Sequence, residues 1–364
     1  MFRSDNTTLE GAADFVELIG NYTEDRSFSL DNVTTDPGYP WDYKYFYFFD
    51  YEAWYNQFRF KLELFLWTKL TLVLAIVCIL GNVLIIIVLT QKTSRIFSTS
   101  IFICSLAFSD MFISIYLLEG FLISNGYIVK AYHEVDCLFR LFLPRAGSRA
   151  SSMMLAVISI ERAVSVKIPH KVKLIFTVKA ARLIVTAVWF IAISTTGLTT
   201  YVYTYVIFRD TPQCLIDQTN KRIAYRVNFF IGKTLLIGAW IVNLVCMIYI
   251  IKALTKNVVG KDKSNKKRIK SVTKTLLIVN IVYFLCVTPD LCYNTYIFVL
   301  RNVIYVRWSF IEYSNHFNAN NIMILIGYCN NVSNFFIYFL SGSKFRSETK
   351  DYFLSCLRKT KTQN

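Results

Sequence analysis

Several polar side chains lie inside long apolar stretches of this sequence, where each needs a physical reason. Asp110 ends the run Leu106-Ala107-Phe108-Ser109-Asp110, Ser151 lies in a second stretch, and Asn330 and Asn334 lie in a third. A buried carboxylate must be protonated, paired or bound to a cation. One acid with a hydroxyl and amide oxygens suits a small hard cation or ordered water. The set therefore predicts either a sodium site at Asp110, Ser151, Asn330 and Asn334 or a structural hydrogen-bond network without an ion.

A second feature of interest is the adjacent pair of opposite charges Glu161-Arg162 at the end of an apolar stretch. An arginine stays charged under all conditions and can pair with its neighbouring glutamate in a functional site. An ordinary ion pair on the protein surface would have the same sequence and is the alternative. Groups that perform covalent chemistry are absent from the sequence: there is no metal-ligand cluster, nucleophile–base pair or phosphate loop, and the three histidines are not well placed. We therefore predict that the protein is not an enzyme and uses no cofactor other than a bound sodium ion.

Long apolar stretches would position these groups. The chain has 364 residues, 54% of them hydrophobic and only 18% charged, with a mean hydropathy of +0.41. A soluble protein is usually 45–50% apolar with about a quarter charged, so this composition indicates a membrane protein. A bilayer-spanning helix needs roughly 20 mostly apolar residues. We predict an all-α membrane protein with seven transmembrane helices, at Leu64–Leu89, Ser100–Leu122, Cys137–Val166, Ala180–Val202, Val227–Leu254, Ser271–Val299 and Asn318–Phe339.

The distribution of basic residues predicts the orientation. The loops after the first, third and fifth spans, with the C-terminal tail, hold 23 of the 40 Lys and Arg residues, and the opposite loops hold seven. Basic loops stay on the cytoplasmic side, so we predict an extracellular N-terminus and a cytoplasmic C-terminus. The net charge of +16 then reflects topology and attraction to the anionic lipid bilayer, with no nucleic acid as a partner.

Both ends of the chain have their own composition. Residues 1–61 hold eleven acidic and five basic residues without the apolar core of a signal peptide, and Asn6, Asn21 and Asn32 begin N-x-[ST] sequons.

We therefore divide the chain into a glycosylated extracellular tail (1–63), a seven-transmembrane domain (64–341) and a cytoplasmic amphipathic helix and tail (342–364). In this last segment apolar residues alternate with Lys and Arg as in a short helix on the inner leaflet. Cys356 there is a candidate for palmitoylation, or a free thiol.

Two of the nine cysteines are predicted to face the oxidising side. Six lie within spans, where a small buried hydrophobe is the ordinary role, and Cys356 lies in the tail. Cys137, at the outer end of the third span, and Cys214, in the loop after the fourth, remain. A disulfide between them is the natural pairing, and it would hold that loop over the mouth of the bundle.

The order of these motifs resembles the rhodopsin-like family of G protein-coupled receptors over roughly residues 64–357. Cys137 precedes Arg162 by 25 residues, as the disulfide cysteine of that family precedes its ionic-lock arginine. The other matching positions follow in the family's order on the remaining spans: Gly81-Asn82, Leu106-Ala107-x-x-Asp110, Pro169, Trp189, Tyr249, Pro289 and Asn334-x-x-x-Tyr338.

The chain also departs from that family pattern. Glu161-Arg162-Ala163 stands where Asp-Arg-Tyr is commonest, and Val287 stands where a tryptophan is usual. Ile241 and Phe335 replace the usual prolines of helices five and seven. Proline normally frees a backbone hydrogen bond and allows a kink, so the route of the signal through this chain must differ.

The resemblance implies a mechanism in which Arg162 pairs with Glu161 at rest. When helix six swings outward, the arginine is released toward Tyr249 and Tyr338 and a cleft for a heterotrimeric G protein forms; arrestin is a further expected partner. In place of the missing tryptophan we expect two aromatic residues one turn below Val287 to pass the signal. The predicted activation switch comprises Glu161, Arg162, Tyr249, Tyr283, Phe284, Pro289, Asn334 and Tyr338.

The ligand-binding residues are predicted from the positions that would face the outer half of the bundle. They are Glu119, Arg140, Arg145, Ser148, Arg149, Lys233, Asp290, Ile324 and Tyr328. Pro144 replaces the aspartate of amine receptors, and charges of both signs suit a peptide better than a lipid or an amine. Arg149 and Asp290 could instead pair with each other. The acidic, tyrosine-rich tail before the first span resembles tails that catch basic peptides, and a solvated interfacial stretch would look the same.

We therefore expect a multi-pass plasma-membrane receptor that binds an extracellular ligand, with a peptide as the expected class, and activates a G protein. A chemosensory receptor for small molecules has the same fold and is the alternative. A polytopic transporter or channel is a third reading, against which the ordered motifs argue.

Overall fold

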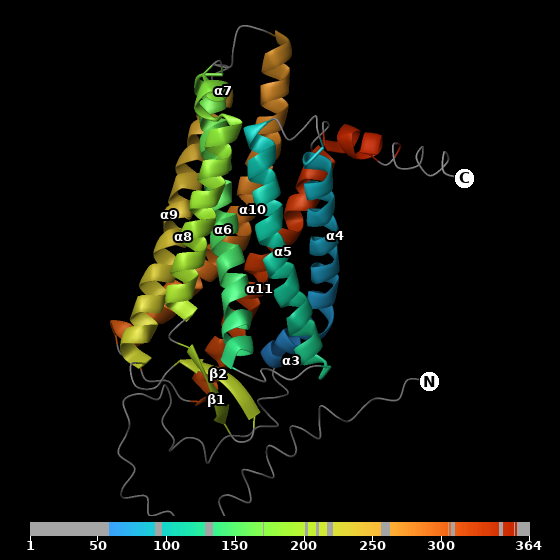
Figure 1. The fold of residues 1–364 in the computed structure, drawn as a ribbon. Helices are drawn as coiled ribbons and strands as arrows, with labels where there is room; N and C mark the ends of the chain where they lie inside the picture. Colours follow the sequence, from blue (N-terminus) through green and yellow to red (C-terminus); the bar gives the residue numbers. More distant parts are fainter. Residues whose placement is uncertain are drawn as a thin grey trace, which may run out of the picture.

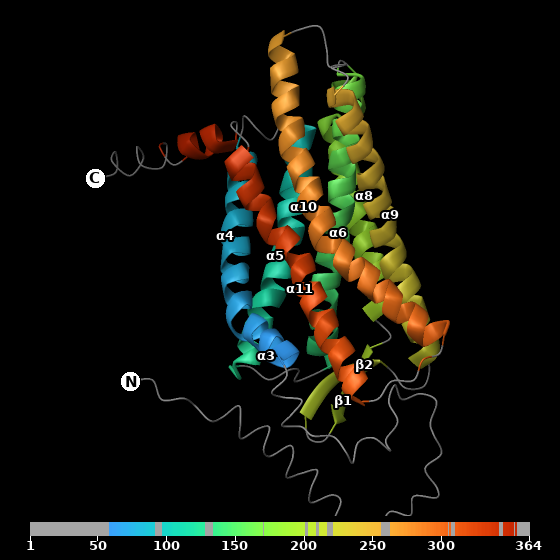
Figure 2. The same cartoon turned by 180° about the vertical axis from the view of Figure 1, so that it is seen from behind.

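The structure is a computed structural model of the whole chain, and it describes residues 58–91, 97–127, 134–169, 171–200, 203–208, 211–216, 221–255, 263–304, 306, 310–341, 345–352 and 354. Long helices run back and forth as a bundle (Figures 1 and 2). They are α3 (Phe58–Phe65), η3 (Leu66–Leu70), α4 (Thr71–Leu89), α5 (Ser98–Ser124), α6 (Glu134–Lys167), α7 (Val172–Ile175), α8 (Val178–Thr200), α9 (Lys221–Thr255), α10 (Lys263–Asn302) and α11 (Phe310–Ser341).

An antiparallel hairpin lies at one end of the bundle, which we call the hairpin end (Figure 1). It consists of β1 (Tyr203–Phe208) and β2 (Thr211–Ile216), with Tyr203 opposite Ile216 and Phe208 opposite Thr211. The opposite end carries α7 and is called the α7 end. The sequence analysis predicted helices alone, so the hairpin is an addition to the predicted fold.

Six described helices are long and apolar enough to cross a membrane: Leu66–Leu89, Ser98–Ser124, Val178–Thr200, Phe229–Thr255, Thr273–Leu300 and Asn318–Leu340. They correspond to six of the seven predicted spans. The other predicted span lies in α6, where Arg140, Arg145 and Arg149 interrupt the apolar run. Large apolar side chains such as Leu80, Leu183 and Leu285 are exposed around the bundle. Such an apolar exterior suits contact with lipid.

The helices extend beyond the predicted spans because polar turns continue them past the apolar core. The first predicted span is continuous with α3 through the π-helical turn η3. Thr177 caps α8 by accepting a hydrogen bond from the Ala180 backbone N–H at 3.1 Å. Gly126, with a φ of 73°, follows the C-terminus of α5, where a left-handed residue is favourable.

The helix packing places α6 at the centre. It contacts α5, α8, α9 and α10, while α10 packs along α11 and α11 closes against α4. The largest core cluster joins Phe102 of α5, Met154 and Ile158 of α6, Tyr283 of α10 and Tyr338 of α11. Two prolines lie inside helices, Pro144 in α6 and Pro289 in α10, and α10 changes direction along its length (Figure 2).

Residues 345–352 form a short helix that lies across the α7 end beyond α11 (Figure 1). Its Phe345 and Thr349 are buried, and Phe345 belongs to the main core cluster, whereas Lys350 is exposed. Arg346 Nη1 donates to the carbonyl oxygens of Phe339 at 3.0 Å and Leu340 at 2.5 Å. These bonds satisfy orphan carbonyls at the end of α11.

Candidate functional site

Three helices meet at the buried carboxylate of Asp110. Asp110 of α5 has no exposed surface. Its Oδ1 accepts hydrogen bonds from Ser151 Oγ of α6 at 2.9 Å and from Asn331 Nδ2 of α11 at 2.5 Å, and its Oδ2 accepts one from Asn334 Nδ2 at 2.8 Å. The sequence analysis named Asp110, Ser151 and Asn334 as one set, and the structure brings these three together.

Asn330, the fourth predicted member, is replaced by its neighbour Asn331. Asn330 is buried, but among the described residues its Oδ1 has no hydrogen-bond partner and it does not bond Asp110. Consecutive helical residues point in directions about 100° apart, because a helix has 3.6 residues per turn. Asn331 lies three residues before Asn334 and Asn330 lies four residues before it, so helical spacing places either one near Asn334. The spacing alone does not distinguish the two, and the rotation of α11 decides between them.

The site retains oxygen atoms that could serve a cation. The Asn334 Oδ1 atom and the Asn82 Oδ1 atom are buried and have no hydrogen-bond partner in the described part of the chain. Asn82 belongs to the same region: its Nδ2 donates to the Cys78 carbonyl at 2.9 Å, and Cys78 Sγ lies 3.7 Å from the Asp110 carbonyl. A carboxylate, a hydroxyl and amide oxygens without partners form a donor set that fits a hard monovalent or divalent cation, or water.

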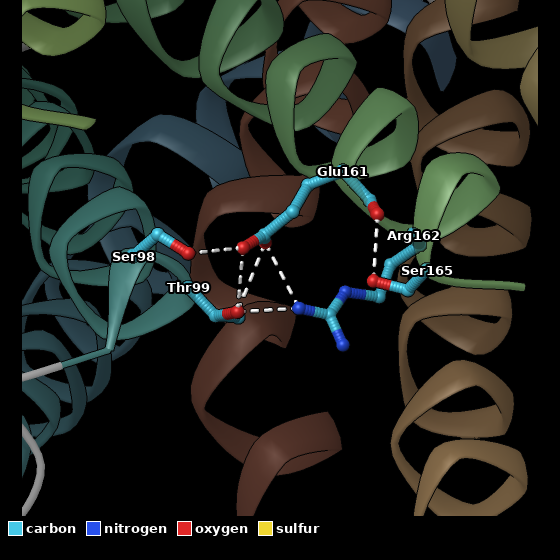
Figure 3. A network of polar contacts seen from close by, with 5 residues as sticks. All are labelled: Ser98, Thr99, Glu161, Arg162 and Ser165. Atoms are coloured by element: carbon cyan, nitrogen blue, oxygen red, sulfur yellow. Dashed lines mark hydrogen bonds and ion pairs between the residues drawn. The ribbon is translucent and has the colours of Figure 1, made fainter. Parts of the chain in front are cut away.

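At the α7 end, Glu161 and Arg162 of α6 form a network with the first turn of α5 (Figure 3). Arg162 Nη2 lies 2.9 Å from Glu161 Oε2 and also donates to Thr99 Oγ1. Glu161 Oε1 accepts from Ser98 Oγ at 2.5 Å and from Thr99 Oγ1 at 2.9 Å. We call Ser98, Thr99, Glu161 and Arg162 the α5–α6 lock. The two hydroxyl partners were not predicted.

The two tyrosines predicted to receive Arg162 differ in their surroundings. Tyr338 of α11 is buried in the main core cluster, and its hydroxyl has no hydrogen-bond partner among the described residues. Tyr249 of α9 is 39% exposed and takes no part in the lock in this structure.

Two predicted switch residues of α10 form an aromatic cluster, and one of them, Phe284, contacts α9. Tyr283 is fully buried, and its ring lies 5.6 Å from that of Phe284 at an angle of 70°. Phe284 in turn meets the indole of Trp240 on α9 edge to face, at 5.4 Å. Val287, at the position where the resemblance led us to expect a tryptophan, packs against the main core cluster. The sequence analysis missed Trp240.

Toward the hairpin end, charged side chains pair between helices. Arg140 Nε of α6 lies 2.6 Å from Glu119 Oε1 of α5, and Lys233 Nζ of α9 lies 3.3 Å from Asp290 Oδ2 of α10. All four side chains retain 14–19% of their exposure. Asn294 Nδ2 also donates to Asp290 Oδ1 at 2.8 Å. These four predicted ligand-binding residues thus form two interhelical pairs.

The alternative pairing of Arg149 with Asp290 is not formed. Arg149 is 4% exposed and donates from Nη1 to Thr196 Oγ1 at 2.9 Å and from Nη2 to Thr199 Oγ1 at 3.0 Å. The two threonines lie three residues apart on α8, so they present both hydroxyls to the guanidinium. Arg149 therefore joins α6 to α8, and Asp290 has Lys233 as its basic partner.

The remaining predicted ligand-binding residues are partly buried on α6 and α11. Tyr328 stacks edge to face on Tyr116 at 5.6 Å, and Tyr116 on Trp67 at 6.0 Å, which joins α11 to α5 and η3. Arg145 Nη1 donates to the Leu141 carbonyl at 3.4 Å. Ser148 and Ile324 are partly buried.

Other predicted features fall outside the described side chains. Asn6, Asn21, Asn32 and Cys356 lie outside the described residues. The backbone of Cys137 lies in α6, and Cys214 lies in β2 opposite Tyr205, but neither side chain is described.

Comparison with known proteins decides the family. The family described as 7 transmembrane receptor (rhodopsin family) matches residues 81–338. This range runs from Gly81 to Tyr338 and includes the buried acid, the α5–α6 lock and both interhelical charge pairs. The chain belongs to the rhodopsin family of seven-transmembrane receptors.

Two relatives of low sequence identity match most of this chain. The chain is 25% identical to galanin receptor 2b of Danio rerio over 299 residues, covering 78% of this chain and 74% of that protein. It is 23% identical to somatostatin receptor type 3 of Rattus norvegicus over 317 residues, covering 80% and 69%. A shorter match, 28% identical over 121 residues, joins it to a QRFP-like peptide receptor of Branchiostoma floridae, covering 33% and 32%.

This membership confirms the predicted family and the prediction that the protein is a receptor and not an enzyme. α6, which carries Arg140, Arg145 and Arg149, is not among the six described helices that are apolar enough to cross a membrane.

Proposed function

We propose that this receptor binds an extracellular peptide at the hairpin end and activates a heterotrimeric G protein at the α7 end. The observation that carries the proposal is the α5–α6 lock at one end of a bundle whose other end holds paired charges of both signs. Three relatives are named as receptors for galanin, somatostatin and a QRFP-like peptide, which supports a peptide as the ligand class.

The two interhelical charge pairs give a peptide a way to act. A ligand that carries a carboxylate and an ammonium or guanidinium group can exchange partners with the Arg140–Glu119 and Lys233–Asp290 pairs. Each exchange loosens a link between α5 and α6 or between α9 and α10. A ligand shifts an equilibrium only by its differential affinity for the two states, and these exchangeable pairs would supply that difference.

The lock would hold the resting state. Arg162 bonds two groups, Glu161 and Thr99, so its release requires both to be given up. Tyr338, buried on α11 with no hydrogen-bond partner among the described residues, is the acceptor proposed for the released guanidinium, and Tyr249 is a second. The freed surface at the α7 end would receive the G protein and, after activation, arrestin.

The same proposal sets the receptor in the plasma membrane with the hairpin end outside. The seven spans then include α6, and the glycosylated tail with Asn6, Asn21 and Asn32 is extracellular. Residues 345–352 form the amphipathic eighth helix, with Phe345 toward the bundle and Cys356 beyond it as a palmitoylation site. A Cys137–Cys214 disulfide would join α6 to β2, and the contacts between α6 and β2 support it.

Sodium is proposed as a regulator of the resting state. Asp110, Ser151 and Asn334 would hold the ion, with Asn331 as the further partner of the carboxylate. The amide oxygens of Asn334 and Asn82, which lack partners in the described chain, support this assignment. The ion would stabilise the arrangement in which α5, α6 and α11 converge.

A peptide-library screen in transfected cells, with calcium and cyclic AMP as readouts, tests the proposal. We expect at least one peptide to raise a signal in receptor-expressing cells, and Asp290→Asn or Glu119→Gln to weaken its potency at matched surface expression. Responses confined to small uncharged molecules would overturn the peptide assignment in favour of a chemosensory receptor. Substrate flux without nucleotide exchange on any G protein would overturn the receptor mechanism in favour of a transporter.

A further inference from the structure

Two separate polar contacts join α9 to its neighbours, one with Thr288 of α10 and one with Ser159 of α6. In the first, Trp240 Nε1 donates to Thr288 Oγ1 of α10 at 3.0 Å, and the same indole meets the Phe284 ring edge to face at 5.4 Å. Thr288 directly follows Val287. An indole in α9 thus lies against the segment of α10 that contains Phe284 and Thr288.

The second contact is a buried network of three side chains. Ser159 Oγ of α6 lies 2.8 Å from Asn243 Oδ1 of α9, and Asn280 Nδ2 of α10 donates to Ser159 Oγ at 2.9 Å. The exposed fractions of Ser159, Asn243 and Asn280 are 1%, 0% and 3%. One hydroxyl therefore ties α9 and α10 to α6 where no water competes for its bonds.

Helical spacing puts the two contacts on the same faces. Trp240 and Asn243 lie three residues apart on α9, and Asn280, Phe284 and Thr288 lie four residues apart on α10. Phe284 lies one helical turn from each of the two polar contacts, between Asn280 and Thr288. α10 packs along α11 far more extensively than along α6 or α9. Toward the hairpin end it also meets α9 through the Lys233–Asp290 pair and through Phe298, whose ring stacks on that of Phe229 at 3.7 Å. The two polar contacts described here therefore join α10 to α9 and α6 nearer the α7 end than those.

We propose that α9 clasps α10 directly through the Trp240–Thr288 bond and indirectly through Asn243 and Asn280, which both bond Ser159 of α6. Opening this clasp would let α10 leave α6 and α9 in the active state. The residues Trp240, Asn243, Ser159, Asn280 and Thr288 are called the α9–α10 clasp. Its hydrogen bonds join α10 to α9 and to α6 in the part of the bundle that holds Phe284. The inference rests on the proposed function for its signalling consequence, but the movement of α10 is independent of which protein reads it.

The clasp has the properties of a two-state device. Its apolar part, the Trp240–Phe284 contact, tolerates sliding, whereas its hydrogen bonds are either formed or broken. Breaking one leaves a buried donor or acceptor unsatisfied, which makes a partly open state costly. The Lys233–Asp290 pair joins the same two helices nearer the hairpin end, so a ligand that disturbs that pair would act directly on the clasp.

Conservative substitutions test the clasp in the full-length receptor reconstituted in lipid nanodiscs. Trp240→Phe removes the N–H donor but keeps an aromatic ring on Phe284, and Thr288→Val removes the acceptor with little change in shape. Each should shift the closed-to-open ratio roughly five-fold toward open, the effect of one ordinary hydrogen bond. The double variant should equal either single one, because both remove the same bond. Thr288→Ser, which keeps the hydroxyl, should lie nearer the wild type than Thr288→Val.

Two readouts separate this inference from the proposed function. The first is the distance between dyes on noncanonical residues at Lys252 of α9 and Lys274 of α10, two exposed positions. The second is ligand-independent nucleotide exchange on a panel of purified G proteins. Thr295→Val is the matched control, since its hydroxyl bonds only the Leu291 carbonyl of its own helix at 2.8 Å among the described contacts.

We expect Trp240→Phe and Thr288→Val to populate a longer inter-dye distance and to raise basal exchange, and Thr295→Val to do neither. A longer distance without any exchange would support the clasp and contradict coupling to a G protein. Unchanged distances in both variants, or additive effects in the double variant, would overturn the clasp whatever the exchange assay shows.

Discussion

Gly147 of α6 lies directly against the backbone of Ser109 in α5. A Cβ atom added at Gly147 would be 2.8 Å from the Ser109 carbonyl oxygen and 2.9 Å from Phe112 Cβ. The carbonyl cannot move without bending α5, which also carries Asp110. This close approach brings Ser151, one turn further along α6, within hydrogen-bond reach of the buried acid.

Gly147→Ala should therefore destabilise the receptor and loosen the Asp110 site. Forcing an extra methyl group into a packed core typically costs about 1–3 kcal/mol. The measurement is the thermal midpoint of the purified receptor. Gly197→Ala on α8 is the control, because nothing lies within 4 Å of the corresponding Cβ position in the structure. Equal midpoints for the two variants would contradict the close contact between α5 and α6.

The Asp110 site should confer sodium sensitivity through Asn331 more than through Asn330. If the ion favours the resting state, raising sodium at constant ionic strength should lower agonist affinity, and Asp110→Asn should abolish the effect. Asn331→Ala should weaken the effect strongly because Asn331 Nδ2 bonds Asp110 Oδ1, whereas Asn330→Ala should weaken it less. An agonist affinity that does not respond to sodium in the wild type would leave the structural hydrogen-bond network as the role of these residues.

Lys233 and Asp290 should be energetically coupled in the ligand-free receptor. A partly exposed ion pair contributes up to about 1 kcal/mol, so a double-mutant cycle with Lys233→Met and Asp290→Asn should give a coupling free energy of roughly that size. Thermal unfolding of the four proteins measures it. The same cycle with Lys233→Met and Glu119→Gln serves as the control, and a coupling no larger than in this control would show that the pair does not hold α9 to α10.

The predicted and observed sites differ in ways that helix geometry explains. Asp110, Ser151 and Asn334 were predictable because a polar group in an apolar helix is costly and stands out from its neighbours. The choice between Asn330 and Asn331 depends on how α11 is rotated about its axis. Adjacent residues point about 100° apart, so an error of one residue in the assumed rotation selects the wrong asparagine. The first strand of the hairpin was predictable from its composition. Residues Tyr203–Phe208 read Tyr-Thr-Tyr-Val-Ile-Phe, which is rich in the β-branched and aromatic residues that favour strands.

The partners of Glu161, Arg149 and Thr288 lay beyond sequence reasoning. Serines and threonines in helices commonly bond the carbonyl one turn back, as Thr90 and Thr295 do here. Nothing local distinguishes Thr99, Thr196 or Thr288, whose hydroxyls instead serve a neighbouring helix. The contact of Trp240 with α10 could not be predicted from the sequence either, because an aromatic residue in a membrane helix usually faces lipid or the core. Only the packing of α9 on α10 reveals its role.

The most direct test of the receptor mechanism is ligand-independent nucleotide exchange on a panel of purified heterotrimeric G proteins, with the full-length receptor in lipid nanodiscs. Glu161→Gln and Thr99→Val remove partners of Arg162, so both should raise basal exchange several-fold over a low wild-type level. Thr90→Val, whose hydroxyl bonds its own helix, should match the wild type. Identical exchange by the wild type, Glu161→Gln and Thr99→Val on every G protein would contradict the account of the α5–α6 lock.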